Sequence, residues 1–305
     1  MSLLFISHPD CVLHDMGDGH PESPMRIDAI KGQLETSTIA GQITYSEAPV
    51  ASREDLYRVH DQAYVNAVFD AAPRQGMVRL DPDTSMNPHS LDAALRAAGA
   101  VIHGVDKIMS SKEKTVFCCI RPPGHHAEHA RAMGFCIFNN VAVGAAHALQ
   151  AHGLSRVAIV DFDVHHGNGT EDIFKDNTGV MLCSSFQHPF YPYSGATTVS
   201  DHIINLPLPA GTDGHAFRNA VEMTFLPALE AFQPELVMFS AGFDAHEEDP
   251  LASMRLREED YAWITVEVKN IAEKYASGRI ISVLEGGYAL SALGRSVIAH
   301  LGALV

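Results

Sequence analysis

VAIVDFDVHHGNG, residues 157–169, joins a short run of apolar, mostly β-branched residues directly to two aspartates, two histidines and two glycines. Near-continuous apolar runs of this kind are typical of strands that are buried on both faces of a parallel sheet. In an open α/β sheet, ligands bind beyond the carboxyl ends of the strands. The stretch therefore predicts a buried strand whose end carries a functional site.

The same arrangement recurs along the chain. Similar apolar runs occupy residues 115–120, 180–183, 236–240 and 280–284. Patterns typical of helices occupy residues 91–110, 141–152, 216–232, 258–276 and 290–304. This alternation predicts an α/β fold with an open, mainly parallel sheet and helices on both faces. A closed (β/α)₈ barrel is the alternative, but eight evenly spaced units are not found. Because no linker or repeat marks a boundary, we expect residues 1–305 to form a single domain.

Composition excludes several classes of protein. Hydrophobic residues make up 46% of the 305 residues and charged residues 19%, which is typical of a globular chain and excludes disorder. The net charge is 21 − 37 = −16, without a basic run, so we expect no nucleic-acid partner. We also expect no membrane partner, because no apolar stretch is long enough to cross a bilayer. Five cysteines without a C-x-x-C pair predict buried thiols in a reducing compartment, and hence a cytoplasmic protein.

Asp163 and His165 are candidate metal ligands. They lie two residues apart, so in an extended segment their side chains point to the same side. A plain Asp–His hydrogen bond at a strand end is the alternative. Asp244, which follows another predicted strand, is the natural third ligand. Three protein ligands with one open position are the pattern of a catalytic zinc site, although Fe²⁺ would accept the same set.

Two further strand ends carry groups that suit hydrolytic chemistry. His125 and His126 follow Gly124, and a histidine there could serve as a general base. Tyr288 follows two glycines, and its hydroxyl could donate to an oxyanion. Residues 134–135 and 190–192 offer aromatic surface for a narrow apolar slot. Core packing is the alternative for the tyrosine and for the aromatic residues.

Together these motifs resemble the zinc-dependent histone deacetylase family, which includes bacterial histone-deacetylase-like amidohydrolases and acetylpolyamine amidohydrolases. The motifs that carry the resemblance are RPPGHHA at 121–127, GFCIFNN at 134–140, DFDVHHGNG at 161–169, AGFD at 241–244 with DP at 249–250, and EGGY at 285–288. Residues 20–26, HPESPMR, resemble the opening motif of that family. The resemblance extends from His20 to Tyr288 and implies an arginase/deacetylase-type fold.

The resemblance also implies roles for individual residues. Asp163, His165 and Asp244 would bind zinc, and His126 would be the general base and acid. His125 would be an electrostatic partner held by Asp161. Tyr288 matches the transition-state tyrosine, and Asn168 stands where class I members carry an aspartate behind the second histidine. A structural K⁺ would use Asp161, Asp163 and His165, with Ser184 nearby.

For the substrate, the resemblance implies a tunnel for an acylated lysine. Phe135, preceded by Gly134, and Tyr191 match its two walls, and Asp83 resembles the rim aspartate that grips the substrate backbone. Leu251 stands where polyamine-selective relatives can place a glutamate. We therefore predict a deacetylase that acts on acyl-lysine in proteins or peptides and releases acetate. The alternatives are an acetylpolyamine amidohydrolase and a non-catalytic acyl-lysine binding protein, and a homo-oligomer is left open.

Overall fold

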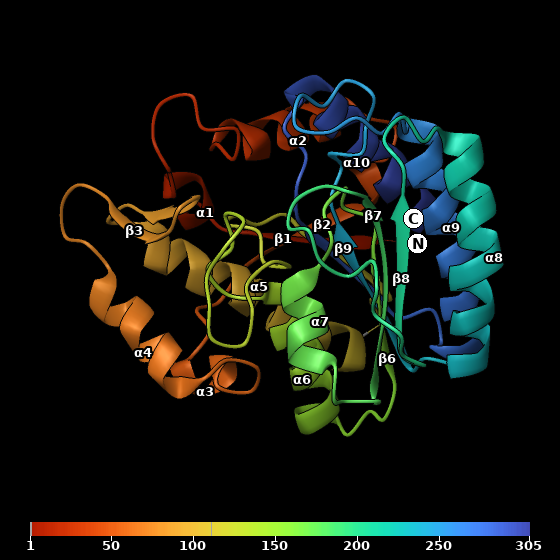
Figure 1. Cartoon of the computed structure of the whole chain (residues 1–305), viewed down its shortest axis with the longest axis horizontal. Helices are drawn as coiled ribbons and strands as arrows, with labels where there is room; N and C mark the ends of the chain where they lie inside the picture. The colour runs from red at the N-terminus through yellow and green to blue at the C-terminus, as the bar shows by residue number, and fades with distance from the viewer. Residues whose placement is uncertain (1, 111) are drawn as a thin grey trace.

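The computed structural model describes residues 2–110 and 112–305. Its main sheet has eight strands, and every pair of neighbouring strands in it is parallel. In spatial order the strands are β2 (Ile43–Glu47), β1 (Leu3–Ser7), β5 (Thr115–Cys118), β10 (Ile280–Leu284), β9 (Leu236–Ala241), β6 (Val157–Asp161), β7 (Val180–Gln187) and β8 (Ile203–Leu208). The sheet is open, with β2 and β8 at its edges, so the barrel alternative is wrong. In Figure 1 the strands of the sheet lie between two groups of helices.

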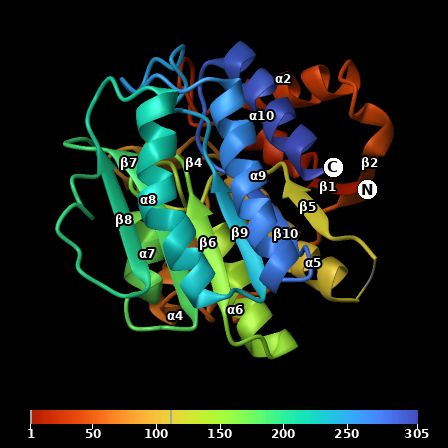
Figure 2. The ribbon, with the colours of Figure 1, turned by 90° about the vertical axis from the view of Figure 1, so that its right-hand side faces the viewer.

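Helices cover both faces of this sheet. One face packs against α2 (Met25–Glu35), α8 (Gly214–Phe232), α9 (Glu258–Tyr275) and α10 (Leu290–Leu304). The other face packs against α1 (Asp10–Leu13), α3 (Arg53–Leu56), α4 (Gln62–Ala71), α5 (Ser90–Ser110), α6 (Asn140–His152) and α7 (Asn168–Phe174). Figure 2 shows α8, α9 and α10 over one face, with α5 and α6 behind it. A 3₁₀ turn, η1 (Ala40–Gln42), and a hairpin of β3 (Val78–Asp81) and β4 (Thr84–Met86) complete the structure.

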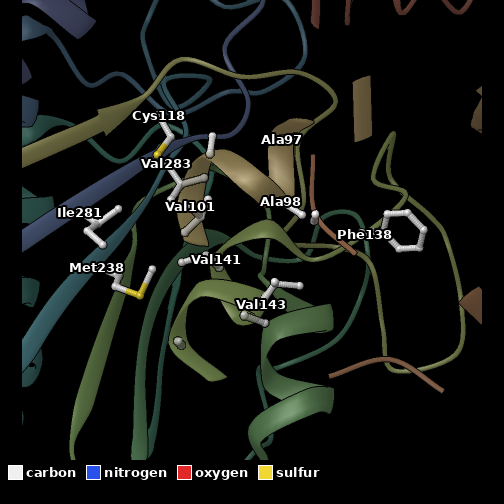
Figure 3. Packing of buried hydrophobic residues seen from close by; sticks show 14 of the residues in the cluster. Ala97, Ala98, Val101, Cys118, Phe138, Val141, Val143, Met238, Ile281 and Val283 are labelled. Atoms are coloured by element: carbon white, nitrogen blue, oxygen red, sulfur yellow. The ribbon is translucent and has the colours of Figure 1, made fainter. Parts of the chain in front are cut away.

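The core has two layers because side chains alternate along each central strand. In β9, Val237 and Phe239 belong to the layer under α8–α10, and Met238 belongs to the layer under α5 and α6. Figure 3 shows this second layer, where both helices meet the strands. Gly144 of α6 permits the close approach, because a Cβ there would overlap Val101 of α5.

The predicted α/β fold with a mainly parallel sheet is confirmed. The five predicted strands and five predicted helices are present, with ends that differ from the prediction by a few residues. Three strands of the main sheet are not among the predicted strands: β1, β2 and β8. β2 and β8 are edge strands with several half-buried or exposed residues, and β8 contains Pro207, so neither shows a continuous apolar run.

All five cysteines are buried and free, as predicted for reduced thiols. Among the helices of the described residues, none is both long and apolar enough to cross a bilayer.

Candidate active site

Four neighbouring strands bring the polar motifs to one edge of the sheet. β5, β10, β9 and β6 are adjacent and parallel, so their carboxyl ends lie side by side. The segments that follow them hold residues 121–126, 285–288, 242–244 and 162–168. Strand order alone therefore explains why these four motifs meet at one place.

Asp163, His165 and Asp244 form a compact, largely buried cluster. Their ligand atoms lie within 4.8 Å of one another. His165 Nδ1 is 3.0 Å from Asp163 Oδ1 and 3.2 Å from Asp244 Oδ2. Asp244 Oδ2 is fully buried and accepts no well-formed hydrogen bond from the described residues. Two buried carboxylates around one imidazole are costly without a cation, so this donor set fits a divalent metal.

Two glycines make this close approach possible. A Cβ at Gly242 would overlap the Asp163 carboxylate, and a Cβ at Gly286 would overlap the carboxylate of Asp244. The Gly286 N–H also donates to Asp163 Oδ2 at 2.9 Å. The glycines of two motifs therefore serve the geometry of the carboxylate cluster.

His125 lies beside the cluster, with Nε2 3.8 Å from Asp163 Oδ1, and is held from two sides. Its Nδ1 is 2.9 Å from Asp161 Oδ2, and its backbone N–H donates to Glu285 Oε2 at 3.1 Å. Glu285 also accepts the N–H of Gly124 at 2.7 Å. Burial lowers the pKa of His125, but the carboxylates of Asp163 and Asp161 outweigh it and raise that pKa well above its usual value.

His126 has a different environment. Its Nδ1–H donates to Asn168 Oδ1 at 2.7 Å, and Asn168 Nδ2 donates in turn to Glu128 Oε1 at 2.8 Å. This chain orients the amide and leaves Nε2 of a neutral His126 as the free acceptor. Burial lowers the pKa of His126, and the neighbouring His125 and His165 lower it further.

A cavity of about 210 Å³ opens above these groups. It is lined by Asp83, His126, Gly134, Phe135, His165, Tyr191, Leu251 and Tyr288. Phe135 adopts a left-handed φ of 69°, which is a strained conformation for a bulky side chain. A Cβ on the preceding Gly134 would overlap the His126 ring. The turn at Gly134 and Phe135 therefore packs directly against the His126 ring.

Tyr288 also lines the cavity, and hydrogen bonds from other side chains hold the backbone around it. Asp249 Oδ2 accepts the Tyr288 N–H at 2.7 Å, and Arg26 Nε donates to Gly287 O at 2.7 Å. The Arg26 guanidinium also lies 5.1 Å from the centre of the Tyr288 ring. Burial, and next the charge of Asp244, raise the pKa of Tyr288 well above its usual value, so its hydroxyl stays protonated.

Ser184 lies on β7, where it pairs with Asp161 of β6. Its Oγ accepts a long hydrogen bond from the Gly167 N–H at 3.4 Å. The potassium site expected at these residues stays a prediction.

Every predicted site residue thus lies in or around the cavity and the carboxylate cluster. Four supporting residues are not among the predicted site residues: Glu285, Asp249, Glu128 and Arg26. All four act on backbone groups or on another side chain, and each lies outside any ligand-like spacing. The only available signal was that three of them lie in or beside quoted motifs, and Arg26 ends a fourth.

Comparisons with known proteins all point to one protein family. Residues 20–304 match the family model described as the histone deacetylase domain. The chain is 38% identical over 277 residues to the histone deacetylase-like amidohydrolase of Pseudomonas aeruginosa, covering 88% of this chain and 73% of that protein. It is 36% identical over 312 residues to the chloroplastic histone deacetylase 14 of Arabidopsis thaliana, covering 94% and 73%. The crystal structure of the HDA15 HD domain superposes with a TM-score of 0.92 at 33% identity, covering 99% and 88%.

Proposed function

The chain belongs to the histone deacetylase family of amide-bond hydrolases, and from this premise we propose that it removes acetyl groups from acyl-lysine in proteins or peptides. The observation that carries the proposal is the cavity, in which two aromatic walls lead to an imidazole and a phenol above a buried carboxylate cluster. Such a slot suits an aliphatic amine chain that ends in an uncharged amide.

Asp163, His165 and Asp244 are the proposed ligands of a divalent metal. The burial of both carboxylates, and the lack of a well-formed hydrogen bond to Asp244 Oδ2 from the described residues, support this role. A zinc-class ion would polarise a carbonyl oxygen and favour deprotonation of water in such a site. Fe²⁺ is the alternative metal, and elemental analysis of the purified protein distinguishes the two.

His126 is the proposed general base and acid. Because Asn168 occupies Nδ1, the free Nε2 can take a proton from the attacking water and return it to the leaving amine. His125 is proposed as an electrostatic partner of the site. The Asp161 carboxylate fixes its ring, so its position does not depend on the substrate.

Tyr288 is the proposed donor to the oxyanion that develops during attack on the amide. Its raised pKa supports this role, because only a protonated phenol can donate. Asp249 and Arg26 hold the backbone of its segment, so the hydroxyl needs little reorganisation to reach the reacting oxygen.

Phe135 and Tyr191 are the proposed walls around the aliphatic part of the substrate. The Tyr191 ring stands edge-on to His126 with centroids 5.4 Å apart, so a chain beside it would end next to the proposed base. The walls would also exclude bulk water from the reacting amide. Asp83, at the same cavity, is the proposed acceptor for the backbone of a bound peptide.

The residues near Leu251 favour acyl-lysine over an acetylated polyamine. Leu251 contributes an apolar side chain to the cavity. The carboxylate that also lines it, Asp83, already accepts the Gly134 N–H at 2.9 Å, so it is less available to bind a secondary ammonium. The nearby acids are already engaged: Glu247 pairs with Arg257 at 2.9 Å, and Glu248 with Arg295 at 2.6 Å. The third, Asp249, accepts hydrogen bonds from the backbone that follows β10.

A direct comparison of substrates tests the proposal. We expect a higher kcat/KM for an acetyl-lysine peptide than for N-acetylspermidine, with acetate released in equal amount to the free amine. A higher value for N-acetylspermidine would identify the chain as a polyamine deacetylase, which its net charge of −16 would also suit. If neither the acetyl-lysine peptide nor N-acetylspermidine is hydrolysed, the proposed chemistry is contradicted.

A further inference from the structure

A second cluster of metal-ligating side chains lies on the helices α5 and α6. Asp106 of α5 faces His147 and His152 of α6, and both imidazole Nε2 atoms are 2.7 Å from the same Asp106 Oδ1. The two rings meet nearly at a right angle, with centroids 5.3 Å apart. Among the described residues, only this group and the carboxylate cluster of the active site bring three such ligand atoms within 4.8 Å.

The convergence of the two histidines is not a consequence of helical spacing. Residues five apart on a helix do not share a face, in contrast to residues three or four apart. His152 is the last residue of α6, and Gly153 then turns the chain with a left-handed φ of 68°, so the helix end can direct its ring back towards His147. Both histidines therefore present Nε2 to one carboxylate.

The donor set and its exposure suit a divalent transition metal. Two imidazoles and one carboxylate are a known ligand set for zinc, with water in the fourth position. The Asp106 side chain is half exposed, at 50%, whereas that of His147 is largely buried, at 10%. The cluster is thus open to solvent on one side, where the fourth position would lie.

This cluster is remote from the active site. α6 begins beside the active-site segments, where the Asn139 side chain donates to the backbone oxygen of Ala127. The helix then runs for 13 residues to His152, a length of about 20 Å at 1.5 Å per residue. Asp106, near the end of α5, meets it there. The two clusters therefore lie at opposite ends of α6.

We propose that Asp106, His147 and His152 form a second divalent-metal site, which ties the end of α5 to the end of α6. Binding to the folded chain alone would raise the free energy of unfolding in the presence of the metal. His147 Nδ1 is buried and has no hydrogen-bond partner among the described residues. Loss of the hydrogen-bond partner on the second ring nitrogen of a metal-binding histidine typically lowers metal affinity by about 10–100-fold. A chelator should therefore remove this metal before the active-site metal.

Metal stoichiometry tests the proposal without reference to activity. Untagged protein is stripped of metal, dialysed against buffered Zn²⁺, and analysed for zinc per chain by mass spectrometry. We expect two equivalents for the wild type and one for His152→Gln. His152 ends its helix and is partly exposed, so this substitution should leave the fold intact, and Asp106→Asn provides a second variant. His215→Gln, at an exposed histidine remote from both clusters, should still bind two.

The outcomes separate this site from the active site. Equal zinc content in the wild type and in both cluster variants would overturn the proposal. A single equivalent in the wild type that His152→Gln removes would support the second site and contradict the active-site metal. In addition, Zn²⁺ added after the first equivalent should raise the Tm of the wild type and of His215→Gln, and should leave that of His152→Gln unchanged.

Discussion

The side-chain oxygen of Asn168 accepts a hydrogen bond from His126 Nδ1 at 2.7 Å. The Asn168 amide donates in turn to Glu128 Oε1 at 2.8 Å, so the carboxylate acts on the imidazole through the amide. Direct contact with a carboxylate would stabilise a charged imidazole, whereas this arrangement fixes the orientation of a neutral one. Asn168 is therefore a positioning residue for the proposed base.

Asn168→Leu should remove the acceptor that fixes the His126 ring. Loss of an orienting partner of this kind typically costs about 10–100-fold in activity. We expect the loss in kcat, with KM for an acetyl-lysine peptide little changed, because the walls of the cavity are untouched. Asn168→Asp keeps an acceptor in the same place and should retain more activity than the leucine variant. Equal activity of Asn168→Leu and wild type would refute the positioning role.

Tyr288→Phe should lower kcat by about 10²–10³-fold, as expected for the loss of one donor to an oxyanion. Steady-state kinetics on an acetyl-lysine reporter, together with measured binding of a non-hydrolysable analogue, separates this effect from a loss of affinity. Tyr261→Phe is a matched control, since the Tyr261 hydroxyl is buried and has no hydrogen-bond partner in the part of the chain described here. Its activity should equal that of the wild type. A fully active Tyr288→Phe would remove the phenol from the mechanism.

Leu251→Glu should shift the preference towards acetylated polyamines. The new carboxylate would lie at the cavity, where it can pair with a secondary ammonium of the substrate. A partly exposed ion pair contributes up to ~1 kcal/mol, so the ratio of kcat/KM for N-acetylspermidine to that for the peptide should rise about fivefold. Leu251→Gln, of similar size but uncharged, should change this ratio far less. An equal shift in both variants would mean that shape rather than charge governs selectivity.

The fold could be predicted largely because its central strands are buried on both faces. The strand is apolar from Leu236 to Phe239, and the position of Asp244 after that strand follows from the sheet. The roles of the site residues came from the resemblance of the motifs. Contacts between distant segments had no such signal: Glu128 lies 40 residues from Asn168, and Asp106 lies 41 residues from His147. Only packing brings these pairs together.

His60 should make the protein less stable in mild acid. Burial lowers its pKa from 6.5 to about 4. The geometry agrees, because Nδ1–H donates to Glu128 O at 3.0 Å while Nε2 accepts the Asn139 N–H at 2.9 Å. Protonation of Nε2 would turn this acceptor into an N–H donor, which would then face the N–H of Asn139. The folded state therefore requires a neutral ring that also ties the segment of Glu128 to the start of α6.

The sign of the effect follows from the lowered pKa. The unfolded chain takes up a proton near pH 6.5 and the folded chain only near pH 4, so the contribution of His60 to stability is complete above pH 6.5 and is lost between pH 6.5 and 4. At 1.36 kcal/mol for each pKa unit, the loss is about 3 kcal/mol. Urea unfolding across this range measures it. In His60→Gln the free energy of unfolding should be lower at pH 7 and should fall less steeply with acid, whereas His215→Gln should follow the wild type. A wild-type slope unchanged by His60→Gln would show that other groups cause the acid sensitivity.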